Sequence, residues 1–282
     1  MQNVISNIIH FIKLSIGKDL SIFDKDFFIH TLESRTGEAG FHTAEEYFYF
    51  IKEHQDEALA FAGAFNVTYS EFFRDPLSYA LLEQWIIPSF FSKKNNAGKK
   101  KIRIWSAAAA SGQEAYSLAI LIDQQKMFSL NNVAVQIFAS DICLSEIEKA
   151  KEGLYPVDQL QKVSLKYLNE YFYSVGDNFK LIPRIREAVE FSTYDILDTK
   201  TISPPDSIYG SFDIIYCSNL FIYYNAKTRS RIVQKLKRNL TNGGLIISDD
   251  SEKKVLERHK LHGVCPPAAI FQYKYQEVSN KQ

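Results

Sequence analysis

The chain has 282 residues, and its 33 Lys and Arg residues balance its 33 Asp and Glu residues, so the formal net charge is zero. That length exceeds one minimal domain and fits a larger unit joined to a smaller one. Hydrophobic residues make up 46% of the sequence, which is enough for a full core. The balanced charge argues against a protein that binds the phosphate backbone of nucleic acids.

The first third of the chain has the apolar spacing of helices. Thr43 followed by Glu46 is a capping box that predicts a helix start, and Asp75 before Pro76 predicts another helix, ending near Pro88. The N-terminus lacks the basic start and cleavage site of a signal peptide, and no run approaches the roughly 20 apolar residues of a membrane helix. We therefore expect a cytoplasmic protein without direct membrane insertion.

A polar stretch at residues 92–101 follows, and its lysines favour a solvated connection over a binding patch. Beyond it, short apolar strands alternate with helices, which predicts a largely parallel sheet covered on both faces. Strands are expected at 102–105, 133–139, 189–191, 212–217 and 245–248, an edge strand at 270–275, and helices at 113–125, 142–151 and 226–240. The prediction is a helical domain at 1–92, an α/β domain at 100–282 and, where the alternation fails, a small inserted subdomain at 155–188.

Small residues gather where the first predicted strand ends. The run from Ser106 to Gly112 reads SAAAASG, which lets a ligand approach the backbone beside the free N–H groups of the next helix. The second strand ends at Asp141, whose carboxylate can accept hydrogen bonds from both hydroxyls of a ribose. Because GxGxxG and the P-loop lysine are absent, a nucleoside without polyphosphate is favoured over ATP or NAD. The other interpretation is a plain strand–helix turn in which Asp141 caps the next helix.

The three cysteines, Cys143, Cys217 and Cys265, are widely spaced, which favours a reducing compartment over a disulfide framework. None lies in a CxxC or beside a His, so we expect no metal site. Cys217 falls at the end of a predicted buried strand and is expected to pack rather than to act as a nucleophile.

Seven segments fall in a fixed order along the chain, and FFRDP and CSNLFIYY are the most specific of their motifs. The segments are SEFFRDP (70–76), WSAAAASGQEAYSLAI (105–120), ASDI (139–142), AKEGLYP (150–156), VEFSTYDIL (189–197), FDIIYCSNLFIYY (212–224) and NGGLIIS (242–248). Together they resemble the chemotaxis receptor methyltransferase (CheR) family over nearly the whole chain. The resemblance implies a helical N-terminal domain, a Rossmann-like S-adenosylmethionine-dependent methyltransferase domain and a small inserted β-subdomain.

The resemblance also implies an activity: methyl transfer from S-adenosylmethionine to glutamate carboxylates of a chemoreceptor-like or other signalling protein, leaving S-adenosylhomocysteine. Arg74 and Tyr223 would be the catalytic residues, with Tyr223 near the transferred methyl group. The cofactor contacts that it implies are Ser70 and Arg74 at the amino-acid end, Ala108 and Glu114 at the loop, Asp141 at the ribose, Asp195 and Ile196 at the adenine, and Asn219 and Leu220 on the sulfonium side.

These roles agree with elementary chemistry. An aromatic face such as that of Tyr223 stabilises a cationic sulfur by roughly 0.5–2 kcal/mol, and a carboxylate fits the forked donors of Arg74. A glutamate acceptor is already ionised at neutral pH and needs no general base. The enzyme must therefore remove water from the acceptor and align the reacting atoms, and such positioning lowers the activation free energy by about 7–11 kcal/mol. Without the resemblance, a surface ion pair for Arg74 and core packing for Tyr223 are the simpler interpretations.

The sequence departs from the family pattern at several positions. Gln113 replaces the first acid of GEEPYS, Ser218 replaces the arginine of CRN, Asp195 replaces an asparagine, and residues 248–252 replace a glycine-rich turn. Only Arg35 remains of the arginine cluster on the second helix that meets acidic receptor helices in the family. An alternative function is therefore a cofactor-binding signalling module with little or no catalysis. A third is a nucleic-acid or small-molecule methyltransferase, against which stand the balanced charge and the missing NPPY-type motif.

Overall fold

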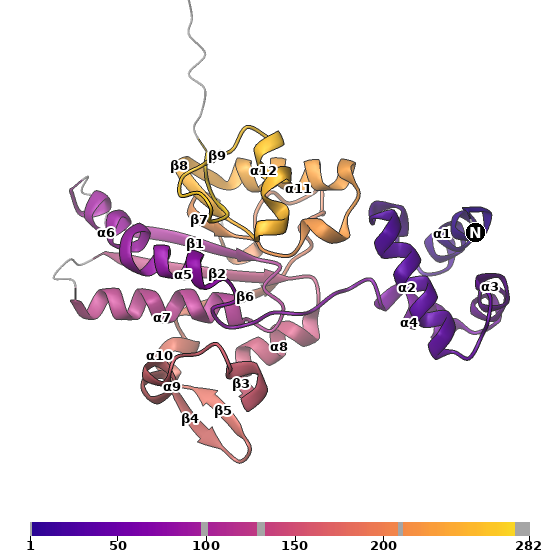
Figure 1. Ribbon diagram of the computed structural model, residues 1–282, viewed down its shortest axis with the longest axis horizontal. Coiled ribbons are helices and arrows are strands. Elements are labelled where there is room, and N and C mark those ends of the chain that lie inside the picture. The colour runs from indigo at the N-terminus through magenta and orange to yellow at the C-terminus, as the bar shows by residue number, and fades with distance from the viewer. Residues whose placement is uncertain (1, 97–100, 129–132, 208–210, 274–282) are drawn as a thin grey trace, which may run out of the picture. The chain divides into compact units, whose positions relative to one another are not determined.

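The computed structural model of the chain describes residues 2–96, 101–128, 133–207 and 211–273 (Figure 1). The chain divides into two compact units, Met1–Val67 with Phe221–Ser230, and Thr68–Leu220 with Arg231–Gln282. Each unit has its own hydrophobic core. The expected domain boundary between residues 92 and 100 remains a prediction. The compact units change at residue 67, and side chains from Phe72 to Phe91 belong to the core of the second unit.

The first unit is helical. Its elements are α1 (Gln2–Ser15), η1 (Leu20–Ile22), α2 (Lys25–Glu38), α3 (Ala44–Glu53), α4 (Gln55–Gly63) and η5 (Phe221–Tyr223). The capping box at the start of α3 is confirmed: the Glu46 N–H donates to Thr43 Oγ1, and the Thr43 N–H donates to Glu46 Oε2. Arg35 pairs with Glu57 at 2.5 Å and with Glu38 at 3.0 Å, so the one retained arginine of α2 is bound within its own unit.

Three consecutive helical segments open the second unit: α5 (Pro76–Leu81), the π-helical turn η2 (Leu82–Ile86) and α6 (Ile87–Asn96). The helix start is confirmed, since the Leu77 N–H donates to Asp75 Oδ1 at 3.1 Å. The prediction that the helix ends at Pro88 is wrong. A proline in a regular α-helix clashes with the carbonyl four residues earlier and offers no N–H, and the π-helical turn directly before Pro88 changes that spacing. The expected connection at 92–101 is therefore helical as far as Asn96.

The second unit contains a seven-stranded sheet (Figure 1). Its strand order is β6-β2-β1-β7-β8-β10-β9. The parallel strands are β1 (Lys101–Ala107), β2 (Ala134–Asp141), β6 (Val189–Thr193), β7 (Phe212–Tyr216) and β8 (Leu240–Ile247); β10 (Ile270–Gln272) and β9 (His262–Gly263) run antiparallel to their neighbours. All the predicted strands are present, and most of their apolar side chains are buried because helices cover the sheet. The last one is not an edge strand, because β9 pairs with it. The end of that predicted strand, 274–275, lies outside the described residues.

The remaining helical elements of this unit follow the predicted alternation. They are α7 (Gln113–Phe128), α8 (Leu144–Glu152), η4 (Pro205–Ser207), α11 (Ala226–Asn239, whose first residues belong to the other unit), η6 (Asp250–Glu252) and α12 (Lys253–Arg258). Among the described helices, none is both long and apolar enough to cross a membrane.

Between α8 and β6 the chain forms a separate three-stranded antiparallel sheet of order β3-β5-β4. Its elements are β3 (Leu154–Pro156), η3 (Val157–Leu160), α9 (Leu165–Tyr171), β4 (Phe172–Val175), β5 (Asn178–Leu181) and α10 (Pro183–Arg186). Tyr155 joins this subdomain to the large sheet: its hydroxyl donates to the Ser111 carbonyl at 2.7 Å, and its ring packs edge-on against Phe72.

Gly112→Ala should destabilise the second unit more than Gly176→Ala. Both glycines have positive φ, a conformation that costs other residues about 1–2 kcal/mol. A Cβ on Gly112 would also lie 2.9 Å from Phe191 Cζ, whereas a Cβ on Gly176 meets nothing within 4 Å. The extra loss in the free energy of unfolding should be about 1–3 kcal/mol, measured by urea denaturation. Equal losses in the two variants would contradict the close approach at Gly112.

Candidate active site

The loop between β1 and α7 has a strained backbone at the carboxyl edge of the sheet. Ala108 has φ +57° and Ala110 has φ +44°, left-handed conformations that alanine rarely adopts. The end of β2 holds this shape: the Ala109 N–H donates to the Ser140 carbonyl at 3.0 Å, and the Ala110 N–H donates to Asp141 Oδ2 at 2.9 Å. The loop therefore presents backbone and methyl groups, which let a ligand come close.

Asp141 is the last residue of β2 and is nearly buried. Its Oδ2 accepts from Ala110 and its Oδ1 accepts from the Cys143 N–H at 2.9 Å. Burial raises the pKa of the Asp141 carboxyl, and these N–H groups oppose that rise by stabilising the charged form. A carboxylate has about four acceptor positions, so acceptor capacity remains for a ribose hydroxyl beside these backbone donors. The side chain shapes the turn before α8, and this bracing is compatible with the predicted ribose contact.

Ser70 and Arg74 lie in the segment that leads into α5. The Ser70 hydroxyl is buried, and among the described residues it has no hydrogen-bond partner. Arg74 is half-buried, with its guanidinium carbon 5.2 Å from the centre of the Tyr69 ring. The Phe73 N–H donates to Ser117 Oγ at 3.1 Å, which fixes this segment against α7. A buried hydroxyl donor and a bidentate cation in the same short segment are suitable groups for the carboxylate of an amino acid.

Glu114, in the first turn of α7, is a buried acid beside this pair. Burial raises its pKa to about 8; the charge of Arg74 opposes that rise, and those of Glu252 and Asp249 add to it. At neutral pH the Glu114 carboxyl is therefore mostly protonated. These electrostatic interactions bring residues from three distant parts of the sequence into one neighbourhood.

Asn219 is held at the end of β7 by an acid that was not among the predicted site residues. The Asn219 N–H, at a residue with φ +55°, donates to Glu252 Oε2 at 3.0 Å, and Ser248 Oγ donates to the same oxygen at 2.6 Å. The Asn219 side-chain oxygen accepts from Ser218 Oγ at 2.8 Å, and Leu220 beside it is half-buried. The acid at the end of the 248–252 turn was visible in the sequence, but nothing there indicated that it reaches Asn219.

Asp195 and Ile196 follow β6 directly. The Tyr194 N–H donates to the Asp141 carbonyl at 2.8 Å, which places this turn next to the predicted ribose contact. Ile196 is buried, while Asp195 is exposed and its Oδ1 accepts from the Leu197 N–H at 2.7 Å. An apolar side chain next to an exposed acceptor is a suitable pair for an adenine ring and its amino group.

Tyr223 belongs to the first compact unit and is described with it. Its ring centre lies 5.0 Å from that of Phe27, and its carbonyl accepts the Asp24 N–H at 2.9 Å. The side chain is half-buried. Its position near a transferred methyl group stays a prediction.

Cys217 is buried beside the site, and burial raises the pKa of its thiol well above the ordinary range. Such a thiol is a poor nucleophile, in agreement with a packing role. Within the described ranges, no group of three or more His, Cys, Asp and Glu residues is arranged to hold a metal ion.

The sheet order, the small-residue loop after β1 and the carboxylate at the end of β2 define a Rossmann-like domain of the class that binds a nucleoside ligand at the carboxyl edge of its sheet. Residues 68–265 match the family described as "CheR methyltransferase, SAM binding domain". The chain belongs to this CheR family, so the resemblance noted in the sequence is confirmed.

Relatives are similar over most of their length. The chain is 28% identical to the chemotaxis protein methyltransferase of Borreliella burgdorferi, covering 89% of this chain and 88% of the relative. It is 33% identical to chemotaxis protein methyltransferase 1 of Pseudomonas aeruginosa, covering 72% of each. Among solved structures, PKMT2 from Rickettsia typhi in complex with AdoHcy matches 57% of this chain and 24% of that chain, with 15% identity and a TM-score of 0.33.

Ser70→Ala should affect stability and cofactor affinity differently. A buried hydroxyl without a partner costs about 1–3 kcal/mol, so its removal should leave the free energy of unfolding unchanged or higher. Affinity for S-adenosylhomocysteine should fall about three- to tenfold in calorimetry, because one hydrogen bond is lost. Ser78→Ala is the control: Ser78 Oγ donates to Asp75 at 2.5 Å, so this variant should lose stability and keep its affinity. Lost stability with unchanged affinity in Ser70→Ala would show that this hydroxyl serves the fold.

Glu114→Gln should flatten the pH dependence of stability. The folded-state pKa of about 8 lies above the ordinary 4.5, so the stability linked to this group is fully present below pH 4.5 and is lost as the pH rises toward 8. The loss is roughly 1.4 kcal/mol for each unit of pKa difference. Urea denaturation between pH 5 and 8 should show a shallower fall for Glu114→Gln, while Glu190→Gln, at an exposed position, should keep the wild-type slope. An unchanged slope in Glu114→Gln would contradict the buried, protonated state.

Proposed function

We propose that this methyltransferase esterifies glutamate side chains of a signalling protein of the chemoreceptor kind, in the cytoplasm. The names of its relatives, chemotaxis protein methyltransferases, support a protein substrate of that kind. The observation that carries the proposal is the electrostatic interaction of Arg74 with the buried Glu114 at the start of α7, together with the buried Ser70 hydroxyl, which has no partner among the described residues and lies in the same segment as Arg74.

Each end of S-adenosylmethionine has matching groups in this proposal. Ser70 and Arg74 bind its carboxylate, and its ammonium group draws Glu114 into the ionised form, since a nearby cation lowers the pKa of a carboxyl. The other contacts proposed are Ala108 at the loop, Asp141 at the ribose hydroxyls, Asp195 and Ile196 at the adenine, and Asn219 and Leu220 on the sulfonium side.

When bound, S-adenosylmethionine supplies a methyl carbon attached to a cationic sulfur, which is a good leaving group. Methyl transfer would join an oxygen of the acceptor carboxylate to that carbon and leave the electron pair of the carbon–sulfur bond on sulfur, so the transfer itself would need no general base. The tasks left to the protein are to exclude water and to orient the carboxylate in line with the sulfur. We assign the orienting role to Arg74 and Tyr223.

Arg74→Ala should lower methyl transfer from tritiated S-adenosylmethionine to a glutamate-bearing substrate protein by about 10²-fold or more. The transferred label should be released as methanol by mild alkali, which identifies a glutamate ester. Arg74→Lys keeps the positive charge but loses the bidentate geometry of the guanidinium group, so it should recover only part of the rate. The control Arg258→Ala, at an exposed position, should keep the wild-type rate of methyl transfer. Full transfer by Arg74→Ala, or label that resists alkali, would refute the assignment.

A further inference from the structure

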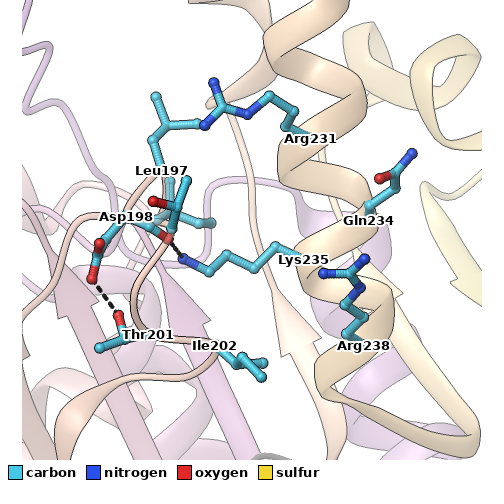
Figure 2. Close-up of a pocket in the computed structure, with 10 residues that line it drawn as sticks. Leu197, Asp198, Thr201, Ile202, Arg231, Gln234, Lys235 and Arg238 are labelled. Carbon is cyan, nitrogen blue, oxygen red and sulfur yellow. Dashed lines mark hydrogen bonds between the residues drawn. The ribbon is translucent and has the colours of Figure 1, made fainter.

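A groove with basic residues on one side runs along the second half of α11, and of the residues assigned above its lining includes Ile196 alone. Helix α11 contains six Lys and Arg residues and no acid, in a chain whose net charge is zero. Within the second unit, Arg231, Lys235 and Arg238 line a cavity of about 210 Å³, closed on the other side by the loop from Ile196 to Ile202. Figure 2 shows Lys235 reaching across to this loop, with Arg231 and Arg238 leaving the helix one turn to either side.

Of the three basic side chains in the groove, Lys235 is held at the facing loop, where the carboxylates of Asp195 and Asp198 partly balance its charge. Lys235 Nζ donates to the Asp198 carbonyl at 2.5 Å, which holds its cation at the loop without pairing it to an acid. In the part of the chain that the structure describes, Arg231 and Arg238 have no ion pair, and both are exposed.

The acids of the facing loop are turned into the loop itself. The Asp198 carboxylate accepts from Thr201 Oγ1 at 2.6 Å and from the Lys200 N–H at 2.9 Å. Asp195 accepts from the backbone of Leu197. The guanidinium groups of Arg231 and Arg238 are therefore exposed cations that the groove offers to a partner, next to acids whose hydrogen bonds are made within the loop.

We propose that this groove binds carboxylate side chains of an acidic helical segment in the protein substrate, an inference that rests on the proposed function. Arg231 and Arg238 are seven residues apart, about 10 Å along the helix axis. That spacing is too long for one small oxoanion and matches glutamates about two turns apart on a neighbouring helix, where guanidinium forks bind carboxylates well. The groove begins at Ile196, one of the residues proposed to contact adenine, so a segment bound there lies against the edge of the cofactor site.

The test is binding of a fluorescent helical peptide with glutamates at positions i, i+4 and i+7 to the full chain at low salt. Arg231→Glu/Arg238→Glu should weaken binding by at least about tenfold. The control variant Lys126→Glu/Lys151→Glu changes the net charge by the same amount at exposed positions on other helices. Its affinity for the peptide should stay within about threefold of the wild-type affinity. Replacing the peptide glutamates with glutamine should abolish binding to the wild type.

Equal losses in the two double variants, equal binding of the glutamine peptide, or no binding to the wild type would overturn the proposal. A parallel loss of S-adenosylhomocysteine affinity in Arg231→Glu/Arg238→Glu would also overturn it, by assigning the groove to the cofactor. The binding assay needs no turnover. Absence of methyl transfer with retained, charge-dependent peptide binding would therefore count against the proposed function while supporting the groove.

Discussion

The hydrogen bond from the Ala110 N–H to the Asp141 carboxylate is the constraint on which the site depends. Left-handed alanines persist only where the surroundings impose that conformation, and here the imposing groups are the last residues of β2. The same carboxylate fixes the turn that leads into α8 through the Cys143 N–H. One side chain thus sets two adjoining loops and still has acceptor positions for a ligand.

Two buried acids near the loop interact electrostatically with each other. Glu114 and Glu252 are buried acids, and both act electrostatically on one neighbourhood with Arg74. Keeping two ionised carboxylates close together in a low dielectric is costly, and the cost falls when Glu114 holds a proton. Glu252 accepts two hydrogen bonds that stabilise its charged form. A buried acid with a raised pKa at the Glu114 position suits a zwitterionic ligand, because its carboxyl can ionise when an ammonium group approaches.

Local patterns predicted most of the architecture. The Thr43 capping box, the Asp75–Pro76 helix start and the alternating strands depend on neighbours in sequence, and each was found where expected. The helix through Pro88 was missed, because a π-helical turn has no sequence signature. The contact of Glu252 with Asn219 was also missed, because it joins residues 33 positions apart. The residues of the candidate site were predicted from the family resemblance and not from local patterns. Residue spacing alone left two interpretations for Asp141, and it indicated only a surface ion pair for Arg74 and core packing for Tyr223.

The bond from the Tyr155 hydroxyl to the Ser111 carbonyl has a consequence for how such domains can be recombined. The inserted subdomain has its own sheet, which makes it look like an exchangeable module. Ser111, however, immediately precedes Gly112, so one of the carbonyls that shapes the cofactor loop is anchored by the insert. A chimaera carrying a foreign subdomain would lose this anchor unless the donor brings an equivalent tyrosine, and it would also have to replace the hydrogen bond between Gln113, at the start of α7, and Gln159 of the insert.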